Sequence, residues 1–182
     1  MAKRVLCIDQ TWSGEELATA EQVRVQLHAT DKGLRVWVES PWYKDPAPPD
    51  APGLVDGLWE YEVVEVFVAS AAEPERYVEV ELGPHGHHLG LRFHGVRRRV
   101  GSPFTFALAT TCEADRWRGE AFIDAEHLPK APWRLNAFAI HASGTGRRYL
   151  LAHALPGGAP NFHQPASFPL WSAWTSDEGL KR

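Results

Sequence analysis

Carboxylate side chains alternate with apolar ones in the stretch 58–86, LWEYEVVEVFVASAAEPERYVEVELGPHG. This pattern predicts two strands joined by a short loop, because successive side chains on a strand point to opposite faces. One face can pack a core while Glu79 and Glu81 line up on the other. Glu65 stands among valines in the first strand, and Trp59 lies at its entrance. Acids in a row beside an indole indicate a surface that binds a polar ligand.

Two carboxyl groups could also catalyse glycoside hydrolysis, which needs two acids at a defined separation. Glu79 and Glu81 are two positions apart on one strand, about 7 Å by strand geometry, and this spacing alone does not indicate catalysis. Strands with one wet face often carry alternating polar residues. A solvated or ligand-binding face is therefore the preferred interpretation. A hydrolase or a metal-dependent lyase that uses the Glu/His cluster is the alternative.

Three histidines follow the acidic strands, at His85, His87 and His88. Zinc needs three or four ligands, and His141 and His163 are further candidates, but no spacing in the sequence connects them. Pro84 and Gly86, on either side of His85, mark a turn. A polar turn is therefore favoured, and no metal ion is predicted.

Composition excludes several classes of function. The chain has 182 residues and a net charge of −4, which predicts one domain over residues 1–182 and lacks the basic surface that nucleic acids require. The one basic cluster, Arg97 to Arg99, is interpreted as a solvated hairpin edge. Cys7 and Cys112 stand in apolar surroundings and are expected in the core, without a disulfide framework.

No targeting or cofactor motif stands out in the sequence. The apolar run at 5–8 is too short for a signal peptide, and no run is long enough to cross a membrane. We therefore expect a cytoplasmic location and no membrane partner. No phosphate-binding loop is present, and the single methionine argues against haem held by a Met–His pair. No cofactor is predicted, and a protein partner stays an open question.

Short strands dominate the pattern of the chain. Alternation at 23–28 and 34–39, around a turn that ends at Gly33, predicts a hairpin. The proline-rich segment 41–57 predicts an ordered loop, since proline cannot donate to a sheet. Further strands are expected at 87–93, 104–111, 117–123, 135–142 and 148–154, a helical turn at 124–128 with Asp124 as its cap, and at most one helix, at 14–22. The pattern predicts an all-β protein, an antiparallel β-sandwich of jelly-roll-like type with short helical turns.

Aromatic residues divide into two groups. Trp37, Trp117 and Trp133 lie on or next to expected strands and are assigned to the core. Trp42 and Phe162 lie in proline-rich loops with polar neighbours, where an exposed ring is expected. Aromatic faces suit the C–H faces of sugars, while carboxylates, amides and imidazoles bond the hydroxyls.

The segments LWEYEVVEVFV, YVEVELGPHG, FAIHAS and NFHQPASF, in this order, resemble carbohydrate-binding modules of family 9 and related β-sandwich domains. They are more similar still to a small uncharacterised family of stand-alone proteins of bacteria and animals. The resemblance spans roughly residues 10–172. It implies a β-sandwich of the carbohydrate-binding type with a site for a sugar end.

Family 9 modules hold the sugar between two tryptophans with polar side chains around it. The resemblance places the first tryptophan at Trp59, in a W-x-x-x-x-V-E segment that ends at Glu65. The second tryptophan position falls on Phe162, just before His163. The remaining polar positions fall on Glu79, Glu81 and His141.

This sequence departs from the modules at several of those positions. Phe162 replaces a tryptophan, and His141 stands where the modules have an amide. Glu79 and Glu81 replace a basic and an amide residue. The resulting surface is more acidic than a typical sugar site, which suggests an amino sugar, another cationic ligand, or a metal held by Glu79, Glu81, His141 and His163.

Taken together, the sequence predicts a non-catalytic protein that binds a small polar ligand, a saccharide, on a sheet face lined by aromatic and acidic residues. A third hypothesis is a protein-interaction domain with Trp42 and Trp174 as exposed anchors. The expected ligand-binding residues are Trp59, Glu65, Glu79, Glu81, His141, Phe162 and His163.

Overall fold

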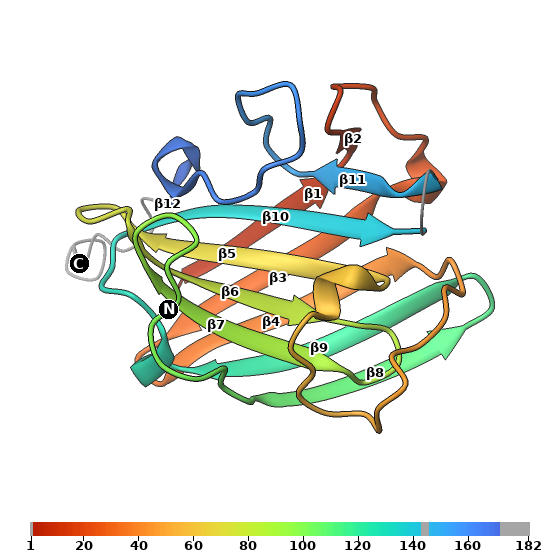
Figure 1. The fold of residues 1–182 in the computed structure, drawn as a ribbon, viewed down its shortest axis with the longest axis horizontal. Coiled ribbons are helices and arrows are strands. Elements are labelled where there is room, and N and C mark those ends of the chain that lie inside the picture. The colour runs from red at the N-terminus through yellow and green to blue at the C-terminus, as the bar shows by residue number, and fades with distance from the viewer. Residues whose placement is uncertain (1, 143–145, 172–182) are drawn as a thin grey trace, which may run out of the picture.

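Two antiparallel β-sheets packed face to face form the molecule (Figure 1). The computed structural model describes residues 2–142 and 146–171. Every strand pair in the described part of the chain is antiparallel, as the hairpin pattern of the sequence predicts. The expected β-sandwich is confirmed.

The first sheet has five strands and is built around the predicted hairpin. Its order is β1 (Ala2–Ile8), β3 (Val23–Thr30), β4 (Gly33–Pro41), β9 (Arg116–Asp124) and β8 (Ala107–Glu113).

The second sheet has seven strands and lies in front of the first in Figure 1. Its order is β2 (Gln10–Thr11), β11 (Arg148–Leu151), β10 (Trp133–His141), β5 (Val63–Ser70), β6 (Arg76–Leu82) and β7 (His88–His94), and β12 (Leu170–Trp171) also pairs with β10.

The central strand β5 is buried on both faces. Val64, Val66 and Val68 point into the core between the two sheets. Val63 and Phe67 point to the other side, where they join a second apolar cluster. This second cluster exists because other segments cover the outer face of the sheet: the 3₁₀ turn η2 (Leu58–Glu60) and the chain that follows β11.

The remaining helical turns are short, and their positions correct two expectations. Segment 14–22 holds only the 3₁₀ turn η1 (Thr19–Glu21), because its first half is extended and forms a bridge to β2. The turn expected at 124–128 is present as η3 (Ala125–His127), but the Asp124 side chain donates and accepts no capping hydrogen bond. The last turn is η5 (Pro165–Ser167). No helix in the described residues is long and apolar enough to span a membrane.

Both cysteines are exposed, so their expected place in the core is wrong. Cys7 lies on β1 between the buried Leu6 and Ile8, and the period of two turns its side chain outward. Cys112 lies on β8, an edge strand of the first sheet. Strand β1 itself was not expected, because three successive exposed residues interrupt its alternation.

Gly33 makes the turn between β3 and β4 possible. Its φ is +151°, and a Cβ at this position would lie 2.1 Å from the carbonyl oxygen of Ile123. We expect Gly33→Ala to lower the free energy of unfolding by about 2–4 kcal/mol, because the neighbouring atom is backbone and cannot move aside.

Urea denaturation measures this loss. Gly158→Ala is the matched control, since an added Cβ there meets nothing within 4 Å and the change stays within about 0.5 kcal/mol. Equal losses for the two variants would contradict the steric account.

Candidate functional site

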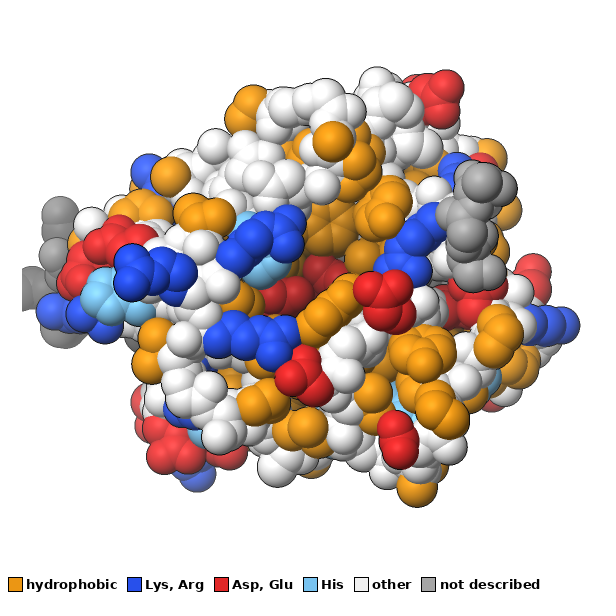
Figure 2. Space-filling view, viewed as in Figure 1, with side chains coloured by type: hydrophobic (Ala, Val, Ile, Leu, Met, Phe, Trp, Pro, Cys, Tyr) orange, Lys and Arg blue, Asp and Glu red, His pale blue; other side chains and the backbone are white. Residues whose placement is uncertain are grey.

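A cavity of about 430 Å³ opens on the outer face of the seven-stranded sheet. Figure 2 shows it as a hollow with acidic side chains at its floor and basic ones beside it. Strands supply the floor, and loops supply the walls and rim. The cavity is lined by Trp59, Glu65, Glu79, Leu91, Phe93, Arg97, Arg99, Ile140, Tyr149, Pro160, Phe162 and His163.

Three buried carboxyl groups cluster at the floor, where Glu65 and Glu79 line the cavity and Glu81 lies behind them. Glu65 on β5 is the direct cross-strand partner of Glu81 on β6, and Glu79 precedes Glu81 on the same face. One oxygen from each residue lies within 4.8 Å of the other two. Their exposed fractions are 1%, 4% and 0% for Glu65, Glu79 and Glu81. Of the two interpretations of this face, solvated or ligand-binding, the solvated one is therefore wrong. The face is buried because η2 and the chain after β11 cover it.

Burial changes the protonation of this floor. It raises the pKa of Glu79 to about 7. It also raises the pKa of Glu65 and of Glu81 well above the usual range, and repulsion between the three groups adds to the effect. Carboxyl groups this close together cannot all ionise in a buried site. The floor therefore holds protons at neutral pH, and it can donate hydrogen bonds as well as accept them.

A chain of polar contacts connects the floor to the rim. The backbone N–H of Arg97 donates to Tyr77 Oη at 3.0 Å, and Tyr77 Oη lies 2.8 Å from His163 Nδ1. Burial raises the pKa of Tyr77 to about 12, so the phenol keeps its proton. Since Oη already accepts from the Arg97 N–H, we assign Nδ1 of His163 as the acceptor of the phenol O–H.

His163 is neutral, and the hydrogen bond from Tyr77 fixes its tautomer. Burial and the nearby Arg97 and Arg99 lower the pKa of His163 to about 4. Since Nδ1 accepts, the ring proton lies on Nε2, which faces Glu79 Oε2 at 3.8 Å. The imidazole therefore presents an N–H group toward the acidic floor.

Aromatic rings form the walls of the cavity. Trp59 lies on one wall, and the guanidinium of Arg99 stands over its ring at 5.1 Å. Phe162 stacks on Phe138 with ring centroids 4.0 Å apart and is only 7% exposed. Phe162 is therefore a fixed wall, and the expectation of an exposed ring is wrong for this residue. Tyr149 meets Phe162 edge-on at 6.1 Å.

Two arginines of the rim were not recognised in the sequence. Arg97 and Arg99 line the cavity, whereas the basic cluster had been interpreted as a solvated hairpin edge. Arg99 Nη1 donates to both carboxylate oxygens of Asp56 at 2.9 Å. Arg97 Nη2 donates to Asn161 Oδ1 at 3.0 Å and so links the two loops beside the cavity. Arg97 and Arg99 are two positions apart in the sequence, and this spacing was the available signal that both side chains point the same way.

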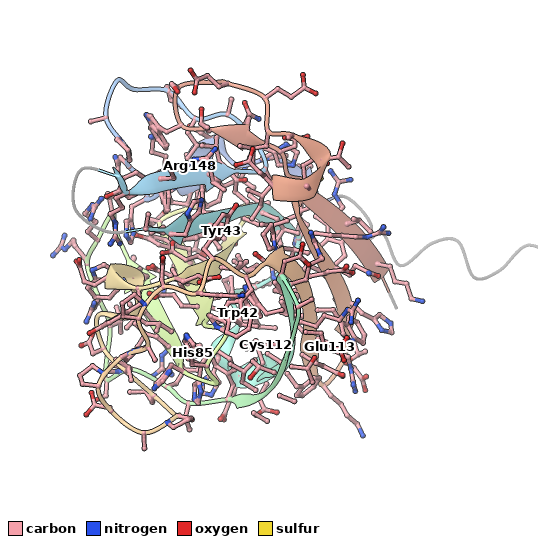
Figure 3. All side chains as sticks on the ribbon, turned by 90° about the vertical axis from the view of Figure 1, so that its right-hand side faces the viewer. Trp42, Tyr43, His85, Cys112, Glu113 and Arg148 are labelled. Carbon is pink, nitrogen blue, oxygen red and sulfur yellow. The ribbon has the colours of Figure 1, made fainter. Side chains whose placement is uncertain are left out.

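The structure does not bring His141 to this cavity. Its neighbour Ile140 faces the cavity, so the alternation of β10 turns His141 to the opposite face. There its ring stacks on Tyr43 at 3.5 Å, and burial lowers its pKa to about 4. Figure 3 shows Tyr43 on the side of the molecule that also carries Arg148. A shared metal site of His141 with Glu79, Glu81 and His163 is therefore excluded by position.

The three histidines at 85–88 also do not form a cluster. His85 Nε2 lies 3.3 Å from the Asp45 carbonyl oxygen, and His87 Nε2 lies 2.9 Å from that of Asp50. His88 Nε2 lies 2.7 Å from Thr105 Oγ1. Among the described residues, the three floor glutamates are the group of His, Cys, Asp and Glu whose ligand atoms lie close enough to share a cation.

The expected protein-binding anchors receive little support. Trp42 is half-buried and packs against the core between the sheets, and its ring meets His85 edge-on at 6.4 Å (Figure 3). Trp174 lies outside the described residues. Trp37 is half-buried on the outer face of the first sheet, whereas Trp117 and Trp133 are core residues as expected.

Comparison of the sequence with known proteins identifies its family. The UPF0462 protein C4orf33 homolog of Rattus norvegicus is 36% identical over 173 residues, which cover 91% of this chain and 86% of the rat protein. The chain belongs to the UPF0462 family. The human member, UPF0462 protein C4orf33, is 34% identical over 164 residues, 86% of this chain and 81% of its own length. No family model matches the sequence.

Solved structures are similar to this UPF0462 chain, and one of them shares its fold. One is a protein from Bacteroides uniformis to which carbohydrate binding has been ascribed, with a TM-score of 0.69, 15% identity, and coverage of 93% of this chain and 85% of that one. Another is a family 9 carbohydrate-binding module from Caldicellulosiruptor kristjanssonii in complex with glucose, with a TM-score of 0.43, 16% identity, and coverage of 71% and 65%. The first of these confirms the fold class.

The raised pKa of Glu79 makes the stability of the UPF0462 chain depend on pH. The unfolded chain releases this proton near the ordinary value of 4.5, and the folded chain releases it near 7. Between these values the folded state binds more protons, so its stability falls as the pH rises. We expect the unfolding free energy of Glu79→Gln, relative to the wild type, to increase by about 1–3 kcal/mol from about pH 5 to about pH 8.

Urea denaturation at the two pH values measures this difference. The comparison with the wild type is needed because His141 and His163, with lowered pKa values, act in the opposite direction below about pH 6.5. Glu75→Gln is the control, because it removes an exposed carboxyl group just before the strand that carries Glu79. Parallel pH profiles of unfolding free energy for Glu79→Gln and the wild type would refute the raised pKa of Glu79.

Proposed function

We propose that the cavity binds a small polar ligand, a saccharide, and does not transform it. The observation that carries the proposal is a floor of buried, hydrogen-bonding carboxyl groups between aromatic walls. A volume of about 430 Å³ accommodates one or two sugar rings, and it falls in the range of small-molecule sites.

Each part of the cavity matches one part of a sugar. The rings of Trp59 and Tyr149 offer apolar faces for the C–H groups of a pyranose. Glu65 and Glu79 offer carboxyl groups that donate or accept hydrogen bonds with hydroxyls, and Nε2 of His163 adds a donor.

The comparisons agree with the choice of a saccharide. The Bacteroides uniformis protein that shares this fold over most of its length is one to which carbohydrate binding has been ascribed. At 15% identity this agreement concerns the fold, and the ligand is argued from the cavity itself.

Trp59→Ala tests the proposal. We expect saccharide affinity to fall at least about tenfold, because the indole lines the cavity and would lose its stacking contact with the sugar ring. Calorimetry with a panel of neutral monosaccharides and disaccharides measures the affinity. An unchanged far-ultraviolet circular dichroism spectrum and denaturation midpoint show that the fold survives.

Trp37→Ala is the matched control, since this half-buried indole lies on the outer face of the other sheet. It should leave affinity unchanged. Equal affinity of Trp59→Ala and the wild type would remove the proposed wall contact. Absence of binding by the wild type to every sugar of the panel would remove the saccharide.

A hydrolase is the second candidate, favoured by the pKa of about 7 at Glu79 and by the imidazole beside it. A group that titrates near neutral pH suits general acid–base catalysis. The three carboxyl groups, however, lie side by side on one floor, whereas glycosidases place their two acids on either side of the bond. Hydrolysis of chromogenic glycosides by the wild type, lost in Glu79→Gln, would favour this candidate over simple binding.

A further inference from the structure

The backbone holds Arg97 at the rim of the cavity in an unusual conformation. Its φ is +57°, in the left-handed region that residues with a side chain rarely adopt. Such a conformation is strained and persists where contacts hold it. Two contacts do so: the Arg97 N–H donates to buried Tyr77, and Nη2 donates to Asn161.

The Arg97 side chain is a cation without a matching anion. Within residues 2–142 and 146–171 no carboxylate forms an ion pair with it, and the amide of Asn161 is its recorded side-chain partner. Arg99, by contrast, is neutralised by Asp56 at 2.9 Å. A guanidinium has five N–H donors in a planar fork that matches a carboxylate or a phosphate. Arg97 therefore keeps donors free at the mouth of the cavity.

The acidic floor does not neutralise Arg97 from below. Among the described residues no ion pair joins Arg97 to the floor, and its charge acts on Glu65 and Glu79 only from a distance, where it opposes the rise of their pKa values. Glu65 and Glu81 are fully buried and retain their protons, so Glu79, whose pKa burial raises to about 7, is the floor group that carries part of a negative charge at neutral pH. Arg97, which has no anionic partner at the rim, would repel a cationic ligand. The positive charge at the rim therefore argues against the amino sugar that the sequence suggested.

We infer that the ligand is an anionic saccharide, whose carboxylate or phosphate binds Arg97 while its hydroxyls reach the carboxyl floor. A ring with an acidic substituent is polarised in the same sense as the cavity, with its charge at the rim and its hydroxyls inside. This inference rests on the proposed function, because it names the class of saccharide for the same site.

Calorimetry with four ligands of one ring type tests the inference: glucose, glucuronate, glucose 6-phosphate and glucosamine, at equal ionic strength. We expect glucuronate or glucose 6-phosphate to bind at least about tenfold more tightly than glucose, the effect of one charge-assisted bidentate contact. The better of the two distinguishes a carboxylate from a phosphate. The preference should decrease as sodium chloride is added, because the rim is exposed.

Arg97→Met should remove the preference for the anionic sugar over glucose. Arg98→Met is the matched control, since Arg98 is the exposed neighbour in the same loop and does not line the cavity. It should retain the preference. If Arg97→Met fails to fold, the salt dependence of the wild type still tests whether a charged contact produces the preference.

The outcomes separate this inference from the proposed function. Equal affinities of the wild type for glucose and both anionic sugars, or tighter binding of glucosamine, would overturn the inference and leave saccharide binding intact. A preference that persists in Arg97→Met would overturn the role of this arginine. No binding of any of the four sugars would overturn both, and binding of acetate or inorganic phosphate as tight as that of the sugars would reduce the site to a simple anion site.

Discussion

Three carboxyl groups buried together on a sheet face are the constraint around which the rest of this structure is arranged. Moving an ionised carboxylate out of water is expensive, and three of them at this separation can be accommodated only if protons remain bound. Apolar residues at Glu65, Glu79 and Glu81 would complete the second apolar cluster without that expense. Perturbed groups of this kind gather at functional sites, which supports the proposal that these acids face a ligand.

Coverage of both faces of one sheet makes this burial possible. The inner face packs against the five-stranded sheet, as in any sandwich. The outer face would ordinarily meet water, but η2 and the chain after β11 pack over it through residues such as Leu58, Phe162 and Phe168. The cavity is the part of the outer face that these segments leave open. Its position follows from where the covering segments stop.

Local patterns were enough to predict most of the fold. The hairpin around Gly33, the proline-rich loop at 41–57 and the alternating strands depend on neighbours in sequence, and such signals are readable. The burial of the glutamates was not predictable in this way, because the segments that cover them lie far along the chain. His141 was misplaced for another reason: a shift of one residue on a strand exchanges its faces, and the resemblance did not fix that register.

The walls and the floor of the cavity belong to different kinds of structure. Its acids stand on paired strands in the middle of a sheet, where a change of register would disturb every neighbour. Its aromatic and basic residues stand mainly on connecting segments, which tolerate insertion and replacement. Exchange of those connections alone could therefore give relatives with new ligand preferences on an unaltered acidic base, much as antibody loops vary on a constant framework.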